Sequence, residues 1–508
     1  MSTTRRGSLV CSSPESNPFV DQDNGSQPFG SLHSQPPQAS GASQYPHDGE
    51  IDIGSSQSTL RETPTSGRSS AEYEGSHLGD IEKSLPIHTI PSLRLLALQS
   101  GQRGHHHGEH NKSYEPRCVE VKSGSDEPAD QPPRSRLGIR ARLEHFTWAW
   151  YTLIMSTGGL SLLIYAQPHQ FRGLRQIGLA VYVINIVLFV LVTSAQVARF
   201  CLFPGTFARS LTHPREGFFF PTFFLSIATL ITSTQRYCVP EDPEVARATA
   251  KGLLVVIQVA FWIYVVVTTS VAVGQYSFVF SAHSFGLQTM MPTWILPIFP
   301  IMLSGTIASV ISETQPVASG VPIVVAGLTC QGLGIAVAFM MYAHMVGRLM
   351  QSGLPNREHR TGLFMCVGPP AFTALAFIGM AQGLPENFDH DMDGLIDAGT
   401  IETVGLIGAG FLWALSFWWF GIAILAVVQS PPKYFHLGWW AAVFPNTGFT
   451  LATISLGKAF HNEPILWFAT SMSILILATF LFVLYHHVRA VIVQDIMYPG
   501  RDEDVEDH

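Results

Sequence analysis

Hydroxyl side chains recur at helical spacing inside apolar stretches of this chain. Two groups are separated by intervals of three or four residues, which places each group on one face of a helix. They are Thr152 and Ser156, on the face of Gly159, and Thr222, Ser226, Thr229 and Ser233. Hydroxyl groups can donate hydrogen bonds to an anion without adding charge to a membrane. The same side chains can instead bond their own helix backbone or join neighbouring helices.

Ionisable side chains are absent from the centres of these apolar stretches. Proton relays and cation pores place carboxylates there, so both are disfavoured. No HExxH pattern or His/Asp arrangement supports an enzyme. The six cysteines form no CxxC pair, which argues against a zinc site or a disulfide framework. We expect no enzymatic activity, metal or cofactor, and no nucleic-acid partner.

Three short motifs lie outside the apolar stretches. Asp389, Asp391, Asp393 and Gly394 match the opening of an EF-hand loop, but the twelfth position is Thr400 instead of Glu, so a solvated acidic loop is favoured over a calcium site. A histidine cluster near the N-terminus is interpreted as polar filler instead of a metal site. It comprises His105, His106, His107 and His110. Ser8 follows Arg5 and Arg6 in the form of a basophilic kinase site, so a kinase acting on the tail is a possible partner.

The composition indicates an all-α integral membrane protein, because 47% of the 508 residues are hydrophobic and 13% are charged. Residues 1–138, rich in Ser, Pro, Gly and Gln, predict a disordered cytoplasmic tail. Residues 139–490 predict a transmembrane domain, and 491–508 a short acidic cytoplasmic tail. Ten stretches of about 20 residues predict membrane helices. They are 146–166, 176–198, 217–235, 252–275, 293–312, 319–343, 361–383, 403–428, 438–457 and 464–485.

Basic residues orient these ten segments, since Lys and Arg remain preferentially on the cytoplasmic side. Arginines before the first segment and in the second and sixth connections fall on one side, which predicts a cytoplasmic N-terminus and C-terminus. They are Arg134, Arg136, Arg140, Arg142, Arg199, Arg209, Arg215, Arg348, Arg357 and Arg360. The connection with Arg236, Arg247 and Lys251 conflicts with this rule, because it is predicted outside.

Helix breakers alternate along the ten segments. Odd-numbered segments contain internal breakers, whereas even-numbered ones have proline only near their starts, such as Pro322 and Pro464. The breakers are Gly158 and Gly159, Pro221, Pro297 and Pro300, Pro369 and Pro370, and Pro445. Backbone groups freed by proline need partners in protein or water. We therefore predict five hairpins whose odd-numbered helices lie inside, around a central path.

Five sequence segments resemble the tellurite-resistance/dicarboxylate transporter family, and specifically its fungal malic acid permease branch. They begin with His145-Phe-Thr-Trp-Ala-Trp-Tyr-Thr-Leu-Ile-Met-Ser-Thr-Gly-Gly-Leu160 and continue with His213-Pro-Arg-Glu-Gly-Phe-Phe-Phe-Pro-Thr222, Glu313-Thr-Gln-Pro316, Gly368-Pro-Pro370 and Trp439-Trp-Ala-Ala-Val-Phe-Pro445. The resemblance covers about residues 140 to 490. It implies ten helices in five hairpins around a central pore, in a homotrimer.

The resemblance also implies a pore gate. Relatives occlude the pore with a phenylalanine on the ninth helix, and Phe444 stands at the matching position, although Phe449 lies one turn later. Together with the hydroxyl pattern, this predicts plasma-membrane transport of malate and related four-carbon dicarboxylates. The predicted path residues are Ser156, Thr222, Ser226, Ser304, Thr373 and Thr447, and the basic residues at the mouths are Arg215, Arg348 and Lys458. Glu216 and Glu313 are expected to pair with basic or polar groups.

Two alternatives stay open at this point. The first is a sulfite efflux pump or small-anion channel on the same scaffold, because a fold does not fix the substrate. The second is a sensor or receptor in which the long tail does the work.

Overall fold

The computed structural model describes residues 136–385, 388–389, 392, 395 and 397–499. Within this described part, helices form all the regular structure, apart from one isolated bridge between Asp389 and Asp397. Ser8, the histidine cluster and nearly all of the predicted N-terminal tail lie outside the described residues. The same holds for Asp391, Asp393 and Gly394 of the acidic loop.

All ten predicted membrane segments coincide with helices. Each odd-numbered segment begins as a 3-10 helix and continues as an α-helix, whereas each even-numbered segment is one long α-helix. The odd segments are η2 (Trp148–Trp150) with α2 (Tyr151–Ala166), η3 (Glu216–Phe219) with α5 (Pro221–Cys238), η5 (Pro292–Ile298) with α8 (Phe299–Ile311), η7 (Arg357–Val367) with α10 (Gly368–Gln382), and η8 (Leu437–Ala442) with α12 (Phe444–Ala459). The even segments are α3 (Leu174–Leu202), α7 (Lys251–Ala282), α9 (Val317–Ser352), α11 (Ala398–Gln429) and α13 (Glu463–Val493).

The remaining elements are short. They are α1 (Ile139–Glu144), α4 (Thr206–Thr212), α6 (Pro243–Thr249), η4 (Leu287–Thr289) and η6 (Ser312–Thr314). Nine of the ten segments are, among the described residues, long and apolar enough to cross a membrane. The tenth is α12, which has 16 residues and is separated from η8 by Val443. The protein is therefore a multi-pass membrane protein.

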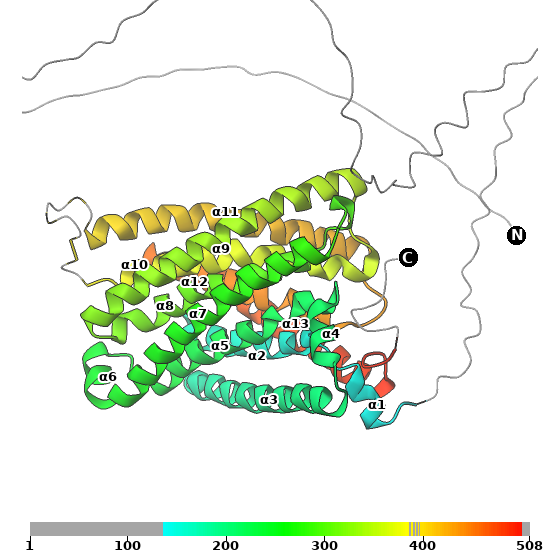
Figure 1. The fold of residues 1–508 in the computed structure, drawn as a ribbon. Coiled ribbons are helices and arrows are strands. Elements are labelled where there is room, and N and C mark those ends of the chain that lie inside the picture. The colour runs from blue at the N-terminus through cyan, green and yellow to red at the C-terminus, as the bar shows by residue number, and fades with distance from the viewer. Residues whose placement is uncertain (1–135, 386–387, 390–391, 393–394, 396, 500–508) are drawn as a thin grey trace, which may run out of the picture. The chain divides into compact units, whose positions relative to one another are not determined.

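The helices α2, α5, α8, α10 and α12, called the inner helices below, form a closed ring. Each packs against the next in chain order, and α12 returns to α2. Each inner helix also packs against the long α-helix that follows it, which gives five hairpins: α2 with α3, α5 with α7, α8 with α9, α10 with α11, and α12 with α13. Figure 1 shows these helices lying along one another.

Burial separates the two sets of helices. In an apolar 18-residue stretch of each of the first four odd segments, 67–94% of the residues are buried. The corresponding share in the five even segments is 17–39%. In α12, 13 of 16 residues are buried. The prediction that the odd helices lie inside is thus confirmed, and the outer helices α3, α7, α9, α11 and α13 present apolar side chains outward.

The prolines of the odd segments mark where the 3-10 helix changes to the α-helix. Pro221, Pro300, Pro369 and Pro445 occupy the first positions of their α-helices. A first-turn residue has no intrahelical acceptor for its N–H, so proline costs little there. The breakers are therefore inside the buried spans, as predicted, and they reset the helix type instead of kinking a continuous α-helix.

Small residues bring the inner and outer helices close together. A Cβ on Gly327 of α9 would lie 2.4 Å from Cβ of Ala308 in α8, and one on Gly334 would lie 2.5 Å from Cβ of Met302. Packing of this kind holds membrane helices together, since lipid supplies no hydrophobic drive between them.

The connections gather at two ends of the ring, as Figure 1 shows. At one end, called the α4 end below, lie α1, α4 and the last turns of α13. Arg142 donates a hydrogen bond there to the carbonyl of Val491, over 2.7 Å. The opposite end, called the α6 end, holds α6, the last turn of α10 and the first turn of α11.

Candidate transport path

A small cavity lies where the five inner helices meet. Its volume is about 20 Å³, room for roughly one water molecule. All five inner helices contribute to its wall, and every lining residue is uncharged. The lining consists of Gly159 and Leu162 (α2), Ala228, Thr229 and Thr232 (α5), Leu303, Thr306 and Ile307 (α8), Phe372 (α10), and Phe444, Thr447 and Leu451 (α12).

Phe444 lines the cavity and belongs to a cluster of three aromatic rings. Its side chain is 1% exposed, and its ring stacks on Phe372 with centroids 5.1 Å apart. The ring of Phe299 meets both edgewise, at 6.2 Å from Phe444 and 5.8 Å from Phe372. Three neighbouring inner helices, α8, α10 and α12, thus each contribute one ring to this cluster.

Phe449, the other aromatic residue considered for this position, faces away from the cavity. Its ring packs against Trp413 and Phe420 of α11, with centroids 5.4 and 5.8 Å away. Phe444 therefore lies beside the cavity, and Phe449 lies against an outer helix.

The six predicted path residues are all fully buried on inner helices. Thr447 lines the cavity and donates to the carbonyl of Phe444 over 2.6 Å. Ser156 and Ser304 are not among the lining residues.

The other three hydroxyls join helices. Thr222 donates to Trp148 O (3.0 Å) and Ser226 to Tyr151 O (3.1 Å), which ties α5 to the first segment. Thr373 accepts a hydrogen bond from the Gln331 side chain of α9 over 2.6 Å. These bonds match the alternative reading of membrane hydroxyls as contacts between helices.

Three further hydroxyls line the cavity: Thr229, Thr232 and Thr306. Thr229 belongs to the hydroxyl stripe seen in the sequence, and Thr232 lies three residues later. The face of α5 that lines the cavity is thus rotated about the helix axis, away from the face that contains Thr222 and Ser226. Spacing alone identified the stripe, but the rotation of α5 depends on how it packs against α2 and α8.

Two adjacent glycines in α2 give the cavity wall its shape. A Cβ on Gly159 would lie 2.7 Å from Thr447 Oγ1 and 3.3 Å from the Phe444 ring. A Cβ on Gly158 would lie 2.3 Å from Thr229 Oγ1. Neither position has room for a side chain, so α5 and α12 approach the α2 backbone directly.

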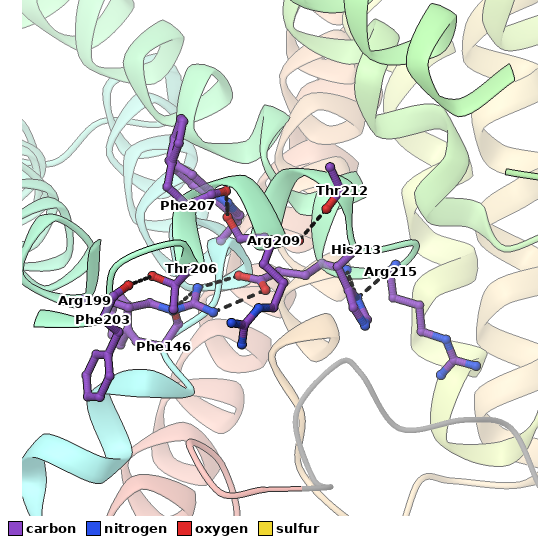
Figure 2. Close-up of polar contacts among 12 residues, drawn as sticks. Phe146, Arg199, Phe203, Thr206, Phe207, Arg209, Thr212, His213 and Arg215 are labelled. Carbon is purple, nitrogen blue, oxygen red and sulfur yellow. Dashed lines mark hydrogen bonds and ion pairs between the residues drawn. The ribbon is translucent and has the colours of Figure 1, made fainter. Parts of the chain in front are cut away.

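Basic residues surround the α4 end. Figure 2 shows Arg209 and Arg215 with their guanidinium groups extended away from the helices and without dashed contacts. Arg199 instead is buried against Glu216, with Nη1 2.6 Å from Oε1, and it also donates to the carbonyl of Phe146. The expected pairing of Glu216 with a basic group is confirmed.

Two more groups affect the charge at this end. Burial lowers the pKa of His436 to about 4, with a smaller contribution from nearby His359, so His436 is uncharged at neutral pH. Arg348 is 8% exposed and donates to the carbonyls of Gln288 and Gly353. Basic residues close to the inner segments at this end thus include the exposed Arg209 and Lys433 and the half-buried Arg215.

The α6 end carries Lys458 and Arg236 on inner helices. Lys458 is exposed in the last turn of α12, 3.5 Å from the carbonyl of Ala166. Arg236 lies over the ring of Tyr165, the residue before Ala166, at 5.8 Å.

Arg247, one of the basic residues that conflicted with the predicted orientation, has local partners at this end. It donates to the carbonyls of Glu313 (2.8 Å) and Thr314 (3.3 Å), directly after α8. A cation at the C-terminal end of a helix complements the helix dipole, which gives Arg247 a structural reason to lie there.

Comparison with known proteins connects this architecture to a family. The family model described as voltage-dependent anion channel matches residues 145–488. A malic acid transport protein of Schizosaccharomyces pombe is 35% identical over 370 residues, 72% of this chain and 83% of the relative. A putative malic acid transport protein of the same yeast is 31% identical over 375 residues, 73% of this chain and 85% of the relative.

A third relative is named for a different substrate, sulfite. A sulfite efflux pump of Trichophyton rubrum is 25% identical over 324 residues, 63% of this chain and 84% of the relative. The family match includes all ten membrane segments in whole or in part and covers more than half of the chain. The chain therefore belongs to the voltage-dependent anion channel family, the same group as the tellurite-resistance/dicarboxylate transporters that its motifs resemble.

Proposed function

We propose that this protein moves malate and related four-carbon dicarboxylates across the plasma membrane along the axis of the inner ring. The observation that carries the proposal is the central cavity, which is lined by all five inner helices and contains four threonines but no charged side chain. Hydroxyl donors without fixed carboxylates suit an anion better than a cation. The similarity to two malic acid transport proteins supports a dicarboxylate as the substrate.

The cavity is too small for a dicarboxylate, so the present arrangement is closed. Phe444 is the proposed gate, because its ring must leave the contacts with Phe299 and Phe372 before an acid can pass. The proposed path continues along hydroxyls of the inner helices: Ser156, Thr222, Ser226, Ser304, Thr373 and Thr447. Arg215 and Arg348 at the α4 end and Lys458 at the α6 end are proposed to raise the local anion concentration.

The relation to the membrane is part of the same proposal. We place the α4 end, with both chain termini, in the cytoplasm, because it carries the predicted majority of arginines. We further propose a homotrimer, as the family resemblance implies, and a non-enzymatic role. Ser8 is proposed as a phosphorylation site of a cytoplasmic kinase.

The test is uptake by the purified full-length chain in proteoliposomes. We expect saturable entry of labelled malate, inhibited by unlabelled succinate or fumarate. Chloride and sulfite fluxes measured on the same vesicles identify the alternative, a sulfite efflux pump or small-anion channel, which the similarity to the sulfite efflux pump supports. Flux of sulfite or chloride without malate would replace the proposed substrate. The absence of all three fluxes would favour the sensor hypothesis.

A further inference from the structure

The outer helix α3 carries a polar seam on its buried side. Its buried residues follow one another at intervals of three, four or seven, the repeat of a helix that packs along another helix. They are Gly178, Tyr182, Asn185, Val192, Gln196 and Arg199. A helix whose other faces are apolar and exposed thus places four polar side chains against the protein.

Two of these polar side chains have partners and two do not. Tyr182 hydrogen-bonds Thr234 of α5 over 2.7 Å, and Arg199 pairs with Glu216. The amides of Asn185 and Gln196 are 0% and 2% exposed, and no group in the described part of the chain hydrogen-bonds either of them. A buried amide inside a membrane normally joins two helices by such a bond, so this explanation does not account for Asn185.

The Asn185 amide lies against the backbone of α2 at Gly158. The Asn185 Nδ2 atom lies 2.9 Å, and Thr229 Oγ1 2.3 Å, from the point that a Cβ of residue 158 would occupy. The two polar groups therefore converge over the bare backbone of α2. Thr229 is itself part of the cavity wall. Any side chain at position 158 would separate Asn185 from this wall.

We propose that Asn185 and Thr229 form a polar site in the wall of the path, which binds one carboxylate oxygen of the passing acid. The Asn185 amide has two N–H donors, and the Thr229 hydroxyl, which now donates to the carbonyl of Ser226 over 2.8 Å, can turn to the same oxygen. A neutral amide binds an anion without holding it as tightly as a fixed cation, which suits a site that must also release its ligand. The inference rests on the proposed transport function and names a residue on an outer helix as part of it.

The experiment compares Asn185→Leu with Gln196→Leu in proteoliposomes. Both changes remove a buried, unpartnered amide from the same seam of α3, but Gln196 does not face the gap at Gly158. We expect Asn185→Leu to raise the KM for malate about tenfold or more, because it removes a hydrogen bond to a charged group. Thr229→Val should raise the KM in the same direction, and Asn185→Ser, which keeps a donor, should restore part of the affinity. Gln196→Leu should leave the KM unchanged.

A second measurement distinguishes binding from packing. Malate should raise the melting temperature of the detergent-solubilised protein, as any ligand of the folded state does. Asn185→Leu should reduce this shift, whereas Gln196→Leu should preserve it. A structural role for Asn185 predicts the reverse: an altered melting temperature without ligand and a normal shift with malate.

The design separates failure of the inference from failure of the proposed function. If the unaltered protein carries sulfite or chloride and not malate, the proposed function fails, and the two Leu variants are compared with the anion that is carried. Equal KM values for Asn185→Leu and Gln196→Leu overturn the inference for whichever anion moves.

Discussion

Two features of Phe444 support its proposed role as a gate, namely its place in the cavity lining and its contacts with two other rings. Its ring contacts the rings of Phe299 and Phe372, with centroids 6.2 and 5.1 Å away. Aromatic contacts of this kind contribute about 0.5–1.5 kcal/mol each beyond their buried area. Breaking these two ring contacts would therefore cost the proposed gate about 1–3 kcal/mol.

Replacing Phe444 by Ala should increase the rate of anion uptake by roughly tenfold, because opening no longer has to break two ring contacts. The measurement is initial malate uptake per amount of folded protein. Phe449→Ala is the matched control, since it truncates an equally buried ring on the same helix that packs against α11. Unchanged uptake in Phe444→Ala, or an equal increase in both variants, would remove the gate assignment.

The ion pair between Arg199 and Glu216 is the most buried charge contact in the described part of the chain. Glu216→Gln should reduce the free energy of unfolding by about 3–5 kcal/mol, because it leaves the Arg199 charge buried without its partner. Glu313→Gln, which alters an exposed carboxylate, should have little effect. Thermal unfolding in detergent measures both.

A double variant tests the cause of this loss. Arg199→Met combined with Glu216→Leu removes both charges and should be more stable than Glu216→Gln alone. A double variant that is as unstable as the single one would mean that packing, and not the stranded charge, is responsible.

At the scale of elements, the contact between α8 and α9 depends on glycine in a way that a matched pair can test. Gly327 meets Ala308 of α8, whereas Gly332 on the same helix has no neighbour within 4 Å of an added Cβ. Gly327→Ala should therefore destabilise the protein by about 1–3 kcal/mol through overpacking. Gly332→Ala should stabilise it slightly, since alanine favours a helix by about 1 kcal/mol over glycine. A change in melting temperature in the same direction for both variants, relative to the unaltered protein, would contradict this packing.

The division into inner and outer helices was predictable from the sequence, because prolines occur inside the inner segments. Pro221, Pro300 and Pro445 distinguish inner from outer segments because lipid cannot satisfy the groups that they free. The 3-10 helices before these prolines were not predicted, since no sequence signal separates them from an α-helical start. Their existence depends on buried neighbours in the ring.

The candidate site was predictable in part, for a related reason. Phe444 was assigned from the family resemblance of the segment that ends at Pro445, and Thr447 from its hydroxyl group. The proposed contribution of Asn185 instead depends on the absence of a side chain at Gly158, on a different helix. Within its own segment Asn185 is one of several polar residues in a mostly apolar run, and nothing in the sequence distinguishes it from Gln196. Only the packing of α3 against α2 places the Asn185 amide beside Gly158.

At the scale of the whole molecule, the ring has basic residues at both ends, on either side of a cavity lined by uncharged residues. The α4 end carries Arg209 and Arg215 near the inner segments, and the α6 end carries Lys458 and Arg236. Such cations act on anions at a distance and are screened by salt. Their effect should therefore depend on ionic strength, whereas contacts within the cavity should not.

Lys458→Gln provides the corresponding test, with Lys251→Gln as its control. Both lysines are exposed at the α6 end, but Lys458 ends an inner helix and Lys251 begins the outer helix α7. If the α6 end faces outward, Lys458→Gln should raise the KM for malate entering cells about two- to fivefold at roughly 0.01 M ionic strength, where the Debye length is about 30 Å. The difference should nearly vanish at about 1 M, where that length is about 3 Å, and Lys251→Gln should follow the unaltered protein at both. A loss that persists at high salt would assign Lys458 a direct contact with the substrate, and no loss at low salt would show that the charge at this mouth does not gather anions.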